Sequence, residues 1–177
     1  MKKIILFVMF SWVATTGLRA QSDPLGRFFQ KYEPDTAFTI VSISPKMFSL
    51  FTSLNLQTGD DQAQQIMEVA RNLTGLRIIT RENAPNSMQL FREAAAALPA
   101  RYDELMSVRD HGMNVKFMVS QDAKGIIHNL VMLAGGGPEF FAMSLSGNID
   151  LKQLSGIAGA MNIQGFDKLK DLKKGNP

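Results

Sequence analysis

The second half of the chain alternates between apolar and polar residues and is interrupted by three tight turns. The alternation is clearest from Met113 to Ser120, where every second position is apolar. A period of two places these apolar side chains on one face of a β-strand. The turns are Asp110-His111-Gly112, Asp122 to Gly125 and Gly135 to Pro138, each with glycine available for a positive φ. Four strands joined by short turns predict an antiparallel meander.

Helical patterns and two further strands occupy the first half of the chain. Residues 36–43 are β-branched and apolar on both faces, which is typical of a central, buried strand. Residues 76–81 alternate and form a second strand. Caps and breakers predict the helices. These are expected from Asp23-Pro24 to about Tyr32, from Ser44-Pro45 to Leu54, from Asp60 to a stop at Gly75, from an Asn86–Gln89 capping box to Pro99, and from Asp150 onward.

These elements predict an α+β fold. Hydrophobic helices must cover at least one face of the sheet, because an isolated apolar face is not stable in water. The expected architecture is a two-layer sandwich with helices packed on one face of a mixed sheet that ends in the four-strand meander. The sequence shows no internal repeat or low-complexity linker, so residues 21–165 are expected to form a single domain.

Residues 1–20 have the pattern of a signal peptide. A cationic start, Met1 to Lys3, precedes an apolar run from Ile4 to Gly17, and Ala20 supplies a small residue for cleavage. The apolar run is short for a membrane span. We therefore expect an exported protein, periplasmic or extracellular, that is cleaved near Ala20; a retained N-terminal anchor is the alternative.

The net positive charge of the chain comes from that leader. The formal net charge is +3, and Lys2, Lys3 and Arg19 precede the expected cleavage site, so the mature chain is neutral. Nucleic-acid binders carry a basic footprint, so no nucleic acid is expected as a partner. The chain has no cysteine, which excludes a disulfide scaffold and a thiol nucleophile.

The sequence contains no recognisable catalytic, cofactor or metal motif. His111 and His128 lie in different predicted elements without metal-ligand spacing. The glycines at 135–137 precede a proline and a strand, whereas a phosphate loop needs Gly-Lys-Ser/Thr before a helix. We therefore expect no catalytic residue, no cofactor and no metal. The alternative is a hydrolase with an unrecognised site assembled from Asp103, Glu104 and His128.

Two groups of side chains are candidates for binding. Arg77 and Arg81 share one strand face and could form an anion-binding patch; a solvated or helix-paired face is the alternative. Phe28, Phe29 and Tyr32 on the first helix could form an exposed aromatic patch for a partner. Docking of that helix on the sheet is the other interpretation.

The last residues, 166–177, are expected to be a flexible basic tail. This tail contains four lysines, Lys168, Lys170, Lys173 and Lys174, and two aspartates, Asp167 and Asp171. Flanking glycines favour a frayed, solvated end. Contact with an anionic membrane surface is the alternative, because the segment is weakly amphipathic.

Three segments resemble a known family. They are FTIVSISPKMF from Phe38, YDELM from Tyr102 and FFAMSLSGNIDL from Phe140. With the short exported N-terminus, they are similar to the domain of unknown function 4252 family of small exported proteins from Bacteroidota-type bacteria, over about residues 28–161. The resemblance implies an envelope or secreted location and supplies no catalytic residues. Many members carry a lipidation cysteine after the signal; this chain has none, which favours a soluble periplasmic or released protein.

We therefore predict a non-enzymatic module that recognises an unknown protein of the cell envelope, or a small ligand, through a sheet or helix face. The prediction rests on three absences: a nucleophile–base pair, a metal spacing and a cofactor fingerprint.

Overall fold

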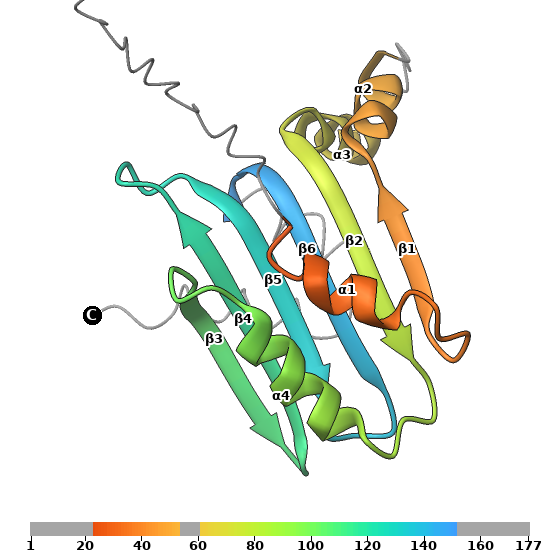
Figure 1. The fold of residues 1–177 in the computed structure, drawn as a ribbon. Coiled ribbons are helices and arrows are strands. Elements are labelled where there is room, and N and C mark those ends of the chain that lie inside the picture. Colours follow the sequence, from red (N-terminus) through yellow and green to blue (C-terminus); the bar gives the residue numbers. More distant parts are fainter. Residues whose placement is uncertain (1–22, 54–60, 152–177) are drawn as a thin grey trace, which may run out of the picture.

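A computed structural model of the protein describes residues 23–53 and 61–151. These residues form one six-stranded antiparallel sheet, in the order β1-β2-β6-β5-β4-β3, and four helices (Figure 1). The helices are α1 (Gly26–Tyr32), α2 (Pro45–Ser53), α3 (Asp61–Arg71) and α4 (Ser87–Ala97), and the strands are β1 (Thr39–Ile43), β2 (Leu73–Arg81), β3 (Asp103–Asp110), β4 (Met113–Gln121), β5 (Ile127–Gly135) and β6 (Phe140–Ile149).

The four-strand meander is confirmed, and with it the α+β class. Strands β3 to β6 are neighbours in chain order, each antiparallel to the next. Their turns use the expected left-handed positions, with φ of 86° at Gly112, 79° at Gly125 and 93° at Gly136. Strand β5 is buried almost throughout, as its apolar sequence predicts.

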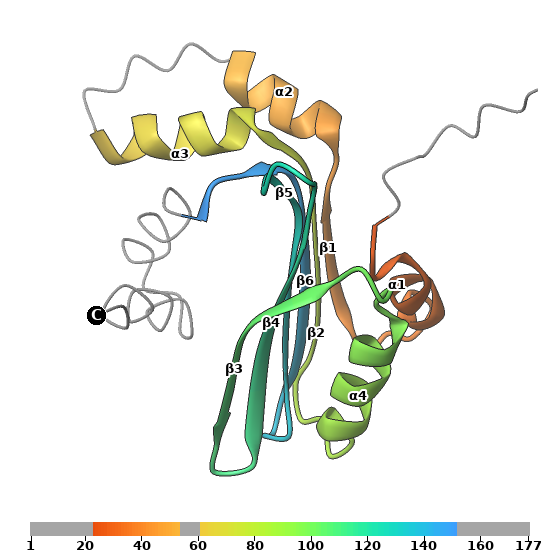
Figure 2. The same ribbon diagram turned by 90° about the vertical axis from the view of Figure 1, so that its left-hand side faces the viewer.

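The expectation of a mixed sheet is corrected, because each ladder among the described strands is antiparallel. Helices α2 and α3 form a hairpin at one end of the sheet (Figure 2). This hairpin returns the chain to the end of the sheet that β1 has just reached, so β2 runs opposite to β1. A parallel pair would need a crossover that travels back along the sheet.

Strand β1 lies at an edge of the sheet, so the expectation of a central strand over 36–43 is wrong. Val41 is 44% exposed. Gly75 was expected to stop a helix, but α3 ends at Arg71 and Gly75 lies within β2, at an irregularity in the pairing with β6. The backbone at Asn72 and Leu73 approaches Gly147 so closely that no Cβ fits there, and Leu73 is the Cα partner of Gly147 in the β2–β6 ladder.

Two apolar clusters fill the two sides of the sheet. The helix-side core lies under α1 and α4, which cover one face (Figure 2), and includes the fully buried Phe29, Val131 and Phe140. The opposite core includes Phe117 and Leu130, both also fully buried. The expectation of helices on one face therefore holds for α1 and α4, whereas α2 and α3 lie at the end of the sheet.

Several expected segments lie outside the described residues. These are the signal peptide at 1–20, most of the expected last helix and the tail at 166–177. Among the helices that the structure does describe, none combines the length and apolar character required to cross a membrane.

Candidate functional site

Helix α1 docks on the sheet through the aromatic residues that the sequence analysis singled out. Phe28 and Phe29 are 2% and 0% exposed. The Phe28 ring lies 5.6 Å from the Phe140 ring of β6 and 4.9 Å from the Tyr32 ring, centroid to centroid. Of the two interpretations, the exposed aromatic patch is therefore wrong at Phe28 and Phe29, and helix docking is correct. The burial of two phenylalanines explains why such a short helix is held in place.

The docked helix brings the two predicted groups of side chains together. The guanidinium carbon of Arg77 lies 4.2 Å from the centroid of the Phe29 ring, and that of Arg81 lies 5.3 Å from the centroid of the Phe38 ring. Both arginines project from the helix-covered face of β2, as the alternation predicts. Cation–π contact with an aromatic face is attractive and restricts the orientation of the guanidinium group.

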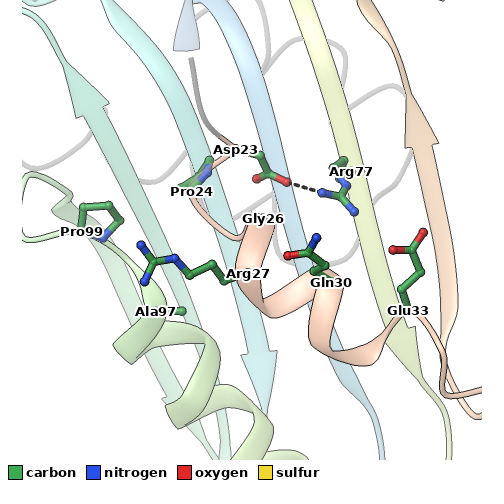
Figure 3. Close-up of a pocket in the computed structure, with 9 residues that line it drawn as sticks. All are labelled: Asp23, Pro24, Gly26, Arg27, Gln30, Glu33, Arg77, Ala97 and Pro99. Carbon is green, nitrogen blue, oxygen red and sulfur yellow. Dashed lines mark hydrogen bonds and ion pairs between the residues drawn. The ribbon is translucent and has the colours of Figure 1, made fainter. Parts of the chain in front are cut away.

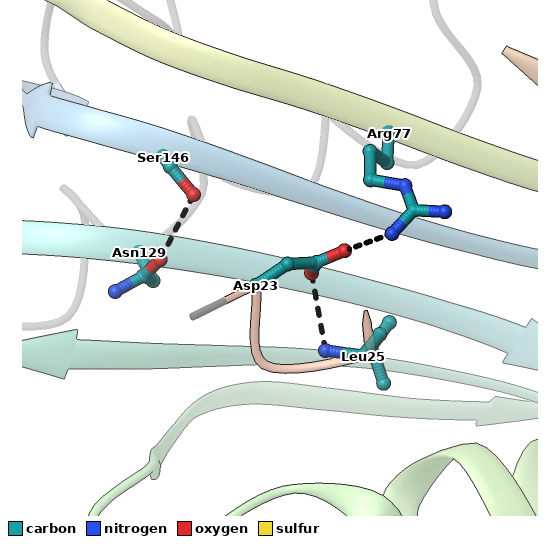
Figure 4. A network of polar contacts seen from close by, with 5 residues as sticks. All are labelled: Asp23, Leu25, Arg77, Asn129 and Ser146. Atoms are coloured by element: carbon teal, nitrogen blue, oxygen red, sulfur yellow. Dashed lines mark hydrogen bonds and ion pairs between the residues drawn. The ribbon is translucent and has the colours of Figure 1, made fainter. Parts of the chain in front are cut away.

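Arg77 also holds a carboxylate. Its Nη1 atom donates to Oδ2 of Asp23 at 2.9 Å, and the other oxygen of Asp23 accepts from the backbone N–H of Leu25 at 3.1 Å (Figure 4). The two side chains are only 30% and 23% exposed, so solvent screens this ion pair less than a fully exposed one. Asp23 thus ties the chain that leads into α1 to the middle of β2.

A groove of about 420 Å³ opens beside this ion pair. The register places Arg77 between Ser42 of β1 and Ser144 of β6. The hydroxyl-bearing side chains that line the groove are Ser42, Ser44, Thr74, Ser144 and Ser146. This hydroxyl groove therefore offers one cation and a ring of hydrogen-bonding groups.

A second hollow of about 710 Å³ adjoins the hydroxyl groove. Arg27, Gln30 and Glu33 line it from the outer side of α1 (Figure 3). Asp23 and Arg77 line both hollows. The Asp23–Arg77 contact consequently lies where the two hollows meet.

Further polar groups are buried on the same face of the sheet. Asn129 of β5 is 8% exposed, and its Oδ1 accepts from the Ser146 hydroxyl at 3.0 Å (Figure 4). Tyr102, 6% exposed, has a hydroxyl with no hydrogen-bond partner among the described residues. Burial raises the pKa of the Tyr102 phenol and outweighs the lowering effect of the nearby Arg101 guanidinium group. The phenol therefore stays protonated and can donate a hydrogen bond.

Comparison with known proteins identifies the family. Residues 32–157, more than half of the chain, match the family described as a domain of unknown function, DUF4252. The chain belongs to this family. A search of curated proteins finds no match, and neither does a search of solved structures. In this DUF4252 protein the matched span includes all the described strands and Arg77, and it begins after Asp23 and most of α1.

The residues of the hydrolase alternative are not joined into one cluster in the DUF4252 fold. Asp103 and Glu104 lie on β3 and His128 on β5, with β4 between them, so the strands are about 10 Å apart. Glu104 pairs with Lys116 at 2.7 Å, and Nε2 of His128 lies 3.2 Å from Oδ2 of Asp122. His111 lies in the β3–β4 turn, 95% exposed at its side chain. Among the described residues, no group of three or more histidines and carboxylates could hold a metal ion.

Sequence reasoning found Arg77 but missed its surroundings. Asp23 was interpreted as a helix cap, yet α1 begins at Gly26 and the carboxylate turns to a strand 54 residues away. The one signal for the hydroxyl groove was the alternation of Ser144 and Ser146 with apolar residues in β6, which places both serines on the helix side. The alternation could not predict that these serines lie beside Arg77, because a local pattern does not reveal the order of the strands in the sheet.

Proposed function

We propose that this DUF4252 protein is an exported binding module of the cell envelope, and that its hydroxyl groove binds a small ligand with a carboxylate or phosphate group. The observation that carries the proposal is the carboxylate of Asp23 already seated on Arg77. A bound ligand would replace that carboxylate on the same guanidinium group. The signal-peptide pattern of residues 1–20 supports export.

The chemistry of the groove suits an anion. A guanidinium group donates two parallel hydrogen bonds to a carboxylate or phosphate, and hydrogen bonds between charged partners are about twice as strong as neutral ones. Phe29 already fixes the orientation of Arg77, so little further ordering is needed on binding. Hydroxyls of Ser42 and Ser144 flank the guanidinium position in the register and can donate to further ligand oxygens. The volume lies within the usual range for small-molecule sites, about 300–1,000 Å³.

We propose binding rather than catalysis because the polar residues of the groove are hydroxyls beside an arginine. Nucleophilic catalysis by a hydroxyl needs a base within hydrogen-bond reach. The carboxylate in the groove, Asp23, is held by Arg77 and Leu25 instead. Recognition of an envelope protein and membrane contact through residues 166–177 remain predictions from the sequence.

Titration calorimetry of the mature chain with inorganic phosphate and with succinate tests the proposal. We expect at least one of these anions to bind, and Arg77→Gln to weaken the affinity about tenfold or more, because a hydrogen bond to a charged group contributes about 1.5–3 kcal/mol. Arg81→Gln is the matched control, since Arg81 lies on the same strand face and stacks on Phe38 but does not line the groove. Equal losses in the two variants, or no binding by the unmodified protein, would contradict the proposal.

A further inference from the structure

The two edges of the sheet differ in how they are protected. Strand β3, at one edge, carries Asp103, Glu104, Arg109 and Asp110 and has a pairing irregularity after Glu104. Charged residues and bulges are the usual devices that keep an edge strand from pairing with another chain. Strand β1, at the other edge, has the sequence TIVSI and contains no ionisable residue. Among the described residues, one edge of the sheet is therefore protected against pairing and the other is not.

The open edge is accessible. Among the described residues, β1 has one ladder partner, β2. Thr39, Val41 and Ser42 are exposed, and Val41 is 44% exposed. Helix α2, which follows β1 directly and lies beyond its end (Figure 1), exposes three more apolar side chains. These are Met47, Leu50 and Phe51, at 46%, 49% and 46%.

We propose that β1 pairs antiparallel with β1 of a second copy of this chain, so that two six-stranded sheets join into one. A two-fold axis at Val41 would place Thr39 opposite Ile43, Ile40 opposite Ser42 and Val41 opposite its own copy. Identical edges meet antiparallel across a two-fold axis, which is the commonest symmetry of soluble oligomers. Because β1 is neutral, the pairing brings no like charges together.

The β1–β1 ladder is too small to form a stable dimer interface without a contribution from other elements. A stable interface buries about 1,200 Å² or more, and a ladder of five residues alone falls short of this. In an antiparallel pair, each α2 lies beyond the first residue of the other copy's β1. The exposed Leu50 and Phe51 of α2 are therefore positioned to extend the contact at both ends of the joined ladder. Such a contact would explain why α2 exposes apolar side chains that do not pack into the helix-side core.

The absence of native cysteine makes a direct test possible. In a Val41→Cys variant the two new thiols would face each other, because residues directly opposite on antiparallel strands have Cβ atoms about 4.5–5.5 Å apart, close to the separation of a disulfide. We expect mild oxidation of the mature protein to give a covalent dimer on a non-reducing gel. Ser107→Cys, at an exposed residue of β3, is the matched control and should give no covalent dimer on the same gel.

Sedimentation equilibrium supplies a test that needs no cross-link. The unmodified mature chain should be a dimer, Val41→Lys should be a monomer at the same concentration, and Ser107→Lys should remain a dimer. Thermal melts establish that both variants fold, which is expected because the two sites are exposed. A monomeric unmodified chain, or equal cross-linking of Val41→Cys and Ser107→Cys, would overturn the proposal. Val41 and Ser107 do not line the hydroxyl groove, so the two proposals can fail separately.

Discussion

Asp23 determines whether Arg77 is available to a ligand. The carboxylate of Asp23 and the phosphate or carboxylate of a ligand would use the same donors on the same guanidinium group. Asp23 is thus an internal competitor that stabilises the empty protein and lowers its affinity for anions. The cost of displacing it is modest, because a partly exposed ion pair contributes at most about 1 kcal/mol.

Replacement of Asp23 by asparagine should therefore strengthen anion binding. We expect Asp23→Asn to raise the affinity for inorganic phosphate or succinate several-fold and to lower the free energy of unfolding by about 1 kcal/mol. Calorimetry and urea unfolding measure the two effects. Asp35→Asn is the control, because Asp35 also accepts a backbone N–H two residues onward, from Ala37, but does not touch Arg77. Weaker binding by Asp23→Asn would show that Asp23 helps to hold the ligand instead.

Glu93 makes the contact between α1 and α4 sensitive to acid. It accepts a hydrogen bond from the Tyr32 hydroxyl at 2.8 Å and pairs with Lys31. Partial burial opposes ionisation of Glu93, but the hydrogen bonds from Lys31 and Tyr32 outweigh it, so the pKa of this carboxyl is lowered from its usual 4.5. A lowered pKa contributes stability that is present above pH 4.5 and is lost as the pH falls through the folded-state value.

Unfolding by urea at several pH values tests the role of Glu93. Glu93→Gln should be less stable than the unmodified chain at pH 7. The difference should begin to shrink as the pH falls below about 4.5, where the unfolded chain takes up the proton, and should vanish once the folded-state carboxyl is protonated as well. Glu139→Gln, at an exposed glutamate in the β5–β6 turn, is the control and should change little. A stability difference that stays constant down to pH 3 would contradict this assignment.

The β5–β6 turn requires glycine at residue 136. The Ser87 hydroxyl, in the first turn of α4, donates to the carbonyl of Gly137 and accepts from the N–H of Gly136 at 3.1 Å. A Cβ atom at Gly136 would lie 2.2 Å from the carbonyl oxygen of Gly112, and the φ of Gly136 is 93°. The β5–β6 turn is therefore held between α4 and the β3–β4 turn, and the space at residue 136 accommodates glycine alone.

Two alanine substitutions separate backbone strain from crowding in these turns. Gly136→Ala should lower the free energy of unfolding by about 2–4 kcal/mol, because it adds a steric clash to an unfavourable φ. Gly125→Ala has a similar φ of 79° but no atom within 4 Å of the new Cβ, so it should cost only about 1 kcal/mol. Urea unfolding of both variants gives the comparison. Equal losses would mean that the close approach at Gly112 relaxes at no cost.

Local sequence patterns predicted the type of each element well, but they did not predict which elements lie next to one another in the fold. The glycine turns and the alternation of β4 were correct, because both are set by residues close in sequence. The capping box at Asn86 was wrong: its side chain makes no capping bond to the helix, and the neighbouring Ser87 bonds to a loop about 50 residues away. Likewise, the apolar sequence of β1 predicted a strand correctly but a central position wrongly, because edge and centre differ only in what lies beside the strand.

The residues of the hydroxyl groove show the same difference between local and long-range features. Arg77 and Arg81 on one face were predicted from a period of two, whereas the pairing of Arg77 with Asp23 spans 54 residues and left no local sign. The position of Ser42 beside Arg77 depends on the order of β1, β2 and β6. Local patterns therefore predicted the cation but not the hydroxyl groove around it.

At the scale of the whole molecule, the expected cleavage near Ala20 can be checked directly. Expression of residues 1–177 in a bacterium, followed by intact-mass measurement of the periplasmic and medium fractions, should give a product that lacks residues 1–20. A mass that still includes the leader would favour the retained anchor. Recovery in the cytoplasm alone would contradict export.

The strand order also bears on how folding is timed. The β1–β2 pair comes early in the sequence, yet the inner neighbour of β2 is β6, the last described strand in the chain. Until β6 arrives, one side of β2 has no partner, and the polypeptide between them forms a wide loop whose closure is entropically unfavourable. The consecutive β3–β6 strands can assemble first and then capture β2. The unfolded chain is therefore exposed to aggregation through the unpaired side of β2 until β6 docks.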